Sequence, residues 1–145
     1  MLPSVMSAGQ GMDGIAWHIL GQTYVPLHRS DASMAWHATF PPGTFVPPHV
    51  HVTQDEFVYV LAGALELDTI AGTSVASPGD LLRLPMGAPH GLFNRSGATT
   101  TCLFWVAPTG RLWGLFAAID GVADPAEVVR LAALHEVEFL PPPYS

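Results

Sequence analysis

The chain has 145 residues and a mass of 15.4 kDa, so we expect residues 1–145 to form a single domain. Hydrophobic residues make up 49% of the chain and charged residues only 12%, a composition typical of a globular domain rather than a disordered segment. Twelve acidic residues stand against five arginines, there is no lysine, and the net charge is −7. The chain therefore offers no basic patch for nucleic acid or an anionic membrane, and no lysine for Schiff-base or P-loop chemistry.

The single cysteine and the lack of long apolar runs narrow the setting further. Cys102 lies in the apolar run 102–106, where we predict a buried, inert thiol, and its isolation excludes an intrachain disulfide and a thiolate metal site. No basic residue precedes Arg29, so we expect no signal peptide. Apolar runs such as 57–62 are too short to span a bilayer, and we interpret the protein as cytoplasmic.

Most of the chain shows short segments of strand periodicity, each followed by glycine or proline. Such close spacing with a turn signal after each segment is typical of an all-β sandwich or barrel. The predicted strands are Ala35–Phe40, Phe57–Leu61, Ala64–Ile70, Leu81–Leu84 and Thr99–Ala107.

The last quarter has a different pattern, which predicts a helical segment over about 111–136. Apolar residues recur at helical spacing over 111–119. A second helix is predicted to begin at Asp124, an N-cap aspartate that is followed by proline at the first helical position and by glutamate three residues after the cap. Residues 138–140 are compatible with a short closing strand.

Three histidines and a glutamate have the spacing of a metal site. His49 and His51 are two residues apart, so on a strand both imidazoles point to one face. Glu56 opens the next predicted strand after a short polar turn, and His90 begins another apolar run. Such a set suits a divalent ion, and we expect one ion per subunit: zinc first, with iron, manganese, nickel and copper as alternatives.

Two motifs in the sequence resemble those of the cupin superfamily. The first is Gly43-x5-His49-x-His51-x4-Glu56-x6-Gly63, over 43–63, and the second is Gly79-x5-Pro85-x-Gly87-x2-His90-x3-Asn94, over 79–94. The resemblance implies a small single-domain cupin (monocupin): a double-stranded β-helix, or jelly-roll barrel, with a metal in its mouth and here a short C-terminal helical appendage. It also implies that the metal ligands are His49, His51, Glu56 and His90.

The segments that flank the motifs are similar to those of the cupin-type cyclases of aromatic polyketide pathways, of the tetracenomycin and resistomycin kind. These segments are residues 17–24, 36–43, 53–57, 84–91 and 135–143. The resemblance implies a metal-dependent polyketide cyclase of antibiotic biosynthesis. Small quercetinase-like monocupins share some of the same features and imply the alternative, a metal-dependent dioxygenase.

His37 is the predicted catalytic residue beside the metal ligands. It lies in the predicted strand that leads into the first motif, and if it faces the barrel interior it would be a general base or a further metal ligand in place of Glu56. The alternative is a hydrogen-bonded histidine in the barrel wall. Gln54 and Asp55 are interpreted as turn residues.

The aromatic residues are compatible with either a packed core or an apolar substrate cavity. This set comprises Trp36, Phe40, Phe45, Phe57, Tyr59, Phe93, Phe104 and Trp105. A cavity of this kind would suit a poly-β-ketone substrate, free or bound to a carrier protein, whose aldol-type ring closure and dehydration a Lewis acid and a base would promote. A non-catalytic, metal-stabilised binding cupin is a further alternative.

We also expect a homodimer. The mean hydropathy is +0.33 and only 12% of the residues are charged, so few charged side chains are available to cover the surface. Trp113, Leu115 and Phe116 lie outside both motifs, and on a monomer they would form an exposed apolar patch.

Overall fold

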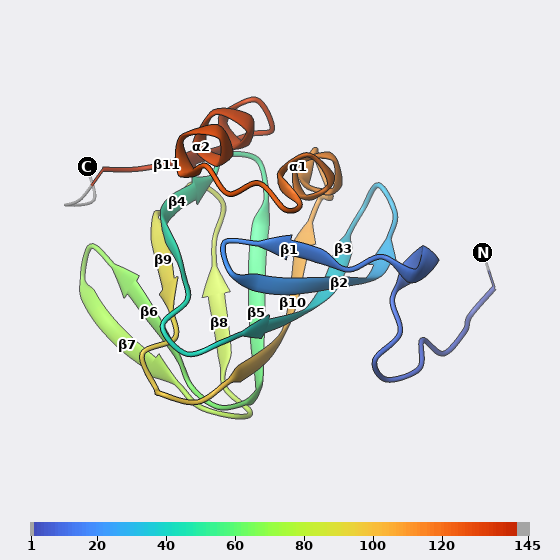
Figure 1. Cartoon of the computed structure of the whole chain (residues 1–145), viewed down its shortest axis with the longest axis horizontal. Helices are drawn as coiled ribbons and strands as arrows, with labels where there is room; N and C mark the ends of the chain where they lie inside the picture. The colour runs from blue at the N-terminus through green and yellow to red at the C-terminus, as the bar shows by residue number, and fades with distance from the viewer. Residues whose placement is uncertain (1, 142–145) are drawn as a thin grey trace.

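The computed structural model describes residues 2–141, whose strands form two antiparallel sheets that face each other (Figure 1). The six-stranded sheet has the order β1-β2-β3-β10-β5-β8 and the five-stranded sheet the order β11-β4-β9-β6-β7. The bounds are β1 Trp17–Ile19, β2 Gln22–Arg29, β3 Met34–Phe40, β4 Phe45–His51, β5 Asp55–Ala62, β6 Leu65–Thr69, β7 Gly72–Ala76, β8 Leu81–Leu84, β9 His90–Phe93, β10 Thr100–Ala107 and β11 Val137–Phe139, with a 3-10 turn at Met12–Gly14. The predicted jelly-roll barrel is confirmed.

The core lies between the two sheets and follows the two-residue period of the strands. In β3, alternate side chains from Met34 to Phe40 are buried, and the residues between them are only partly buried. β10 shows the same alternation and pairs with β3 on one side and β5 on the other. These three strands are the centre of the six-stranded sheet, and their inner face forms one wall of the barrel.

Two helices cover one end of the barrel, and we call them the helical cap: α1 (Leu112–Ile119) and α2 (Pro125–Ala133) (Figure 1). Asp124 caps α2 as predicted, because its carboxylate accepts a hydrogen bond from the N–H of Ala126 at 3.0 Å. Among residues 2–141, no helix has the length and apolar character needed to cross a membrane.

The helical cap buries the residues that were expected to form an exposed apolar patch. Leu115 and Phe116 are only 3% and 8% exposed. Trp113 packs edge-on against Trp17, with ring centroids 4.9 Å apart, and lies under the guanidinium of Arg29. The predicted patch is therefore wrong, because α1 turns its apolar face onto the open end of the barrel.

Candidate metal centre

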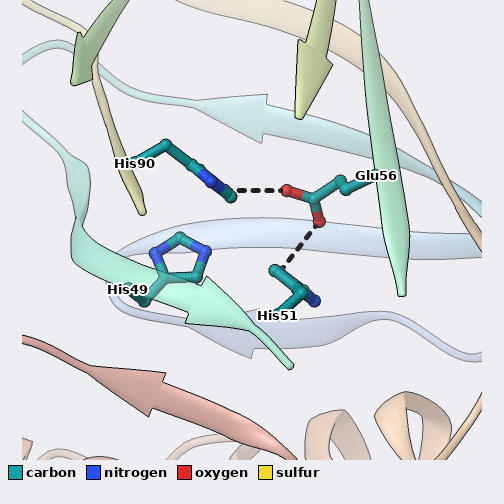
Figure 2. Close-up of side chains that lie close together, drawn as sticks. All are labelled: His49, His51, Glu56 and His90. Atoms are coloured by element: carbon teal, nitrogen blue, oxygen red, sulfur yellow. Dashed lines mark hydrogen bonds and ion pairs between the residues drawn. The ribbon is translucent and has the colours of Figure 1, made fainter. Parts of the chain in front are cut away.

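Three histidines and one glutamate converge inside the barrel (Figure 2). His49 and His51 come from β4, Glu56 from the start of β5 and His90 from the start of β9. All four are buried, with between 2% and 5% of their surface exposed, and a ligand atom of each lies within 4.8 Å of the others. Because β5 belongs to one sheet and β4 and β9 to the other, the cluster forms only when the two sheets close on each other.

A break in the pairing of β4 helps to bring both of its histidines to the inner face. The register with β9 shifts between Val46 and His49, where the chain runs through Pro47–Pro48. Proline donates no backbone N–H, so it is tolerated where a ladder is interrupted. Beyond this point the strand alternates normally, and His49 and His51 both face inward, as their spacing predicted.

Each imidazole is oriented through its Nδ1 atom. The Nδ1 partners are Pro47 O for His49 (2.8 Å), Gln54 Oε1 for His51 (2.8 Å) and Ala88 O for His90 (3.0 Å). An oxygen of this kind can only accept, so Nδ1 carries a proton in all three rings and Nε2 is the nitrogen left to bind a metal ion. The Nε2 atoms of His51 and His90 are 3.3 and 3.2 Å from the two carboxylate oxygens of Glu56. The rings are therefore held in the tautomer that a metal ion requires.

Gln54 is the functional residue that the sequence interpretation missed. It was expected to be a turn residue, but it is 4% exposed and accepts the hydrogen bond from His51. Its side-chain amide donates to the backbone oxygens of Pro108 and Thr109, at 3.0 and 2.7 Å. These two contacts determine which way the amide faces, so the oxygen is the atom presented to His51. The only signal in the sequence was its place between two ligands of the first motif.

Hydrogen bonds join the turns of the two motifs and so bring His90 to the other ligands. The N–H of Gly87 donates to the backbone oxygen of His51 at 2.9 Å. The N–H of Met86 donates to the carboxylate of Asp55, also at 2.9 Å. Asp55, which was expected to be a turn residue, is thus the first residue of β5 and a tie between the motifs.

The surroundings of the cluster favour an ionised Glu56 and a neutral His49. Burial opposes ionisation of Glu56, but the attraction of His51 and the hydrogen bond from His90 outweigh it and lower its pKa to about 2. Burial, followed by repulsion from His90 and His51, lowers the pKa of His49 to about 3. A carboxylate and neutral imidazoles are the forms that bind a divalent ion.

The donor set fits such an ion. Three imidazole nitrogens and a carboxylate oxygen are common ligands of zinc and of other divalent transition metals. The same four residues could hold a metal here.

The structure does not bring His37 to this cluster. Its neighbours in β3, Trp36 and Ala38, face the core and are 1% and 0% exposed, so His37 points to the opposite, outer face of the sheet, where it is half-buried. The expectation that His37 faces the barrel interior is therefore wrong. Glu56 rather than His37 is the fourth member of the cluster.

A cavity adjoins the cluster and extends toward the helical cap. About 500 Å³ of space is free of atoms in and in front of this cavity, and this figure includes the open solvent at its mouth. Besides His49, His51 and Glu56, it is lined by Ile19, Leu20, Tyr24, Trp36, Val46, Leu92, Phe104, Leu112, Leu115, Phe116, Ile119, Ala132, Val137 and Phe139. Apart from Glu56, no charged side chain lines the cavity within the described part of the chain.

The predicted aromatic set divides between the two faces of the sheets. Trp36 and Phe104 line the cavity with their rings stacked 5.2 Å apart, and Phe40 is buried in the core beside them. The other five face away from the core, and among them Phe57 stacks on Trp105 at 5.2 Å. The two interpretations of this set, core and cavity, are therefore both correct for part of it only.

Comparison with known proteins shows which proteins share this fold. A family model described as a cupin domain matches residues 36–106, and no curated protein matches the chain. Residues 36–106 therefore match a cupin domain, and both predicted motifs lie within this range.

Three solved structures illustrate the shared fold. The polyketide cyclase RemF from Streptomyces resistomycificus is 24% identical, with a TM-score of 0.61 over 74% of this chain and 80% of its own. An RmlC-like cupin from Shewanella frigidimarina is 18% identical, with a TM-score of 0.63 over 74% and 96%. A sugar phosphate isomerase of the cupin superfamily from Silicibacter pomeroyi is 27% identical, with a TM-score of 0.56 over 72% and 69%.

Proposed function

We propose that this protein is a metal-dependent cyclase that closes rings in a poly-β-ketone by aldol-type condensation and loss of water. The observation that carries the proposal is the position of the cluster at one wall of an apolar cavity without cationic side chains. Such a cavity can take an uncharged, apolar chain and present its carbonyl groups to a metal ion. The flanking segments that are similar to polyketide cyclases, and the fold shared with RemF, support the same assignment.

The lining of the cavity argues against a phosphorylated substrate. Enzymes that act on sugar phosphates hold the phosphate with arginine, lysine or oriented N–H groups. This chain has no lysine, and none of its five arginines lines the cavity. The isomerase from Silicibacter pomeroyi is therefore a relative in fold whose substrate class does not suit this cavity.

The four clustered residues would hold the metal, which when bound supplies a Lewis acid that polarises a ketone and stabilises enolate charge. Protons on a carbon between two carbonyl groups are already acidic, so a modest acceptor suffices. With His37 on the outer face, Glu56 is the carboxylate that lines the cavity, and its two oxygens face different histidines. Because its pKa is lowered to about 2, Glu56 is a weak proton acceptor, and we assign it to holding the ion rather than to taking up the proton.

The proposed reaction needs no oxidant. Loss of the methylene proton gives an enolate, whose carbon forms a bond to the carbon of a distant ketone. The oxygen of that ketone takes up the proton and becomes a hydroxyl group. This hydroxyl group and a neighbouring hydrogen then leave as water, so the product gains a ring and gains no oxygen atom.

The test is turnover of a linear poly-β-ketone with and without oxygen. We expect cyclised product at the same rate under strict anaerobiosis as in air, with no label from ¹⁸O₂. The Glu56→Gln variant should lose turnover, whereas His37→Gln should keep it, since His37 is remote from the cavity. Oxygen-dependent cleavage, or release of carbon monoxide from a flavonol, would instead establish the dioxygenase. Ligand binding without turnover would establish a binding cupin.

A further inference from the structure

One polar group of a residue that lines the cavity has no hydrogen-bond partner within the described part of the protein. Among the described residues, the indole Nε1 of Trp36 is the only buried side-chain nitrogen or oxygen without a hydrogen-bond partner. Trp36 is 1% exposed and lines the cavity. A buried donor without an acceptor costs about 1–3 kcal/mol, so an orphan of this kind calls for an explanation.

The surroundings of Trp36 are aromatic. Phe104 stacks on its ring at 5.2 Å, and Phe116 of the helical cap meets it edge-to-face at 5.1 Å. An aromatic face is at best a weak acceptor for an N–H group. A carbonyl or enolate oxygen that entered the cavity would therefore be a much better partner for this N–H group than these aromatic rings.

The other polar groups around the cavity already have partners. The hydroxyl group of Tyr24 donates to Gln22 Oε1 at 2.7 Å, and burial raises the pKa of this phenol, so it keeps its proton. The Nδ1 protons of His49 and His51 are donated to protein oxygens, and Glu56 is an acceptor. Along the described cavity wall, the free donor is thus the indole of Trp36.

We infer that the Trp36 indole N–H binds a carbonyl or enolate oxygen of the substrate and so sets which part of the chain lies at the metal centre. This inference rests on the proposed function for the class of substrate, a β-ketone. The site requires an oxygen acceptor within an otherwise apolar ligand, because every other wall contact away from the cluster is apolar or already paired. Trp36 is therefore a specificity-determining residue, and its role is separate from that of the four clustered residues.

The test compares two small ligands that differ in their oxygens, 1-phenylbutane-1,3-dione and 1-phenylbutane, on the zinc-loaded protein. In a ¹⁵N-edited NMR spectrum of the four indoles, the diketone should move the Trp36 signal downfield and leave the other three in place. Trp36→Phe should weaken diketone binding about tenfold, the loss of one hydrogen bond, and change binding of the hydrocarbon less than twofold.

Matched variants separate the N–H group from packing. Phe104→Leu removes cavity-wall volume but no polar atom, and should weaken both ligands alike. Trp105 lies on the outer face of the sheet, so Trp105→Phe should change the binding of neither ligand. Single replacements of Trp17, Trp105 and Trp113 assign the Trp36 signal by elimination, so the spectrum decides the question even if Trp36→Phe does not fold.

The outcomes are distinct from those of the cyclase test. Diketone binding with an unmoved Trp36 signal, equal weakening of both ligands by Trp36→Phe, or no diketone binding at all would overturn the inference. A shifted Trp36 signal without cyclisation of the long substrate would leave the Trp36 assignment standing and overturn the cyclase. Cyclisation with an unmoved Trp36 signal, and with unchanged kcat and KM in Trp36→Phe, would leave the cyclase assignment standing and overturn the Trp36 assignment.

Discussion

At the scale of single residues, the metal centre depends on how each imidazole is held as much as on which residues are present. Pro47, Gln54 and Ala88 each accept the Nδ1 proton of one histidine, and the Nε2 atoms are left for an ion. Partners of this kind make ligands more basic and keep them in place, and their loss typically weakens metal affinity about 10- to 100-fold. Gln54, the only side chain among the three acceptors, therefore belongs to the site.

Replacing His49 or His90 by alanine should leave only a small fraction of the one ion expected per subunit. Of the three histidines among the proposed ligands, two lie in β4 and one lies in β9, so either change removes a ligand from the coordination sphere. Elemental analysis of purified protein measures the metal content. His37→Ala is the matched control and should keep its metal, because His37 faces away from the cluster. Stoichiometric metal in both ligand variants would show that the ion binds elsewhere.

The metal-free protein should lose stability in acid. The pKa of His49 falls from 6.5 to about 3 on folding, so below pH 6.5 the unfolded chain takes up a proton that the folded chain does not. This contribution to stability is complete above pH 6.5 and is lost progressively as the pH falls toward 3. The free energy of unfolding should fall by about 1.4 kcal/mol per pH unit from this one group once the pH is well below 6.5.

Urea denaturation at pH 7, 6, 5 and 4.5 measures this slope. The pKa of Glu56, lowered to about 2, adds a loss of the same sign only below its ordinary value of 4.5. The range from pH 6 to 4.5 therefore isolates the histidine contribution. His49→Gln has no imidazole to protonate and should give a shallower slope, and equal slopes in the two proteins would refute the assignment.

At the scale of elements, the other motif residues hold turns rather than metal. Asn94 is buried, and its side-chain amide donates to the backbone oxygens of Phe40 and Ala98 at 2.8 and 2.7 Å. Gly63 ends β5 with φ +79°, and its backbone passes close to Thr100. These contacts hold the end of the barrel opposite the helical cap.

Gly63→Ala should destabilise the protein far more than Gly43→Ala. Both glycines have a φ near +80°, so each change incurs the cost of a left-handed alanine, about 1 kcal/mol. At Gly63 the new Cβ would also lie 2.6 Å from Thr100 Oγ1 and 2.7 Å from the backbone oxygen of Thr99, whereas at Gly43 it meets nothing within 4 Å. We expect a further loss of about 1–3 kcal/mol at Gly63. Urea denaturation compares them, and equal losses would contradict this account.

At the scale of the whole molecule, two regions matter for different reasons. The helical cap lies over the cavity, and the outer surface of the six-stranded sheet is our candidate for a subunit interface. Nearly all side chains that line the cavity are buried, and residues of the helical cap and of the β1–β2 turn form part of its wall. Within the described residues, the outer face of the sheet carries apolar side chains that are exposed or only partly buried. They are Phe57, Tyr59, Leu81, Leu103 and Trp105.

We propose that this outer face, rather than the residues of α1, pairs two subunits. Tyr59 and Leu81 are 40% and 46% exposed and lie opposite each other in β5 and the edge strand β8, and an apolar patch of this kind marks an interface. Light scattering at micromolar concentration should give the mass of a dimer for the parent protein and of a monomer for Tyr59→Glu. Ile70→Glu, at a site that is 84% exposed between β6 and β7, should remain dimeric. A monomeric parent protein would refute the homodimer.

Local patterns in the sequence were enough to predict the barrel and the cluster. Strand periodicity, turn residues and motif spacing are local properties, and they sufficed for β3, β5, β6, β8 and β10 and for the convergence of the four clustered residues. The same signals were too weak for β1, β2 and β7, which were not predicted. Proline inside β2 and the small residues of β7 hide the alternation there.

Long-range packing in the folded chain determines which face of each element is buried and what each polar group contacts. Alternation places Trp36 and His37 on opposite faces but does not say which face is inside, and the packing of the two sheets made Trp36 the cavity residue. The burial of Gln54 depends on Pro108 and Thr109, more than fifty residues away. The burial of Phe116 depends on how α1 covers the barrel. Long-range packing controls these features because the free energy of burial depends on neighbours that no local pattern specifies.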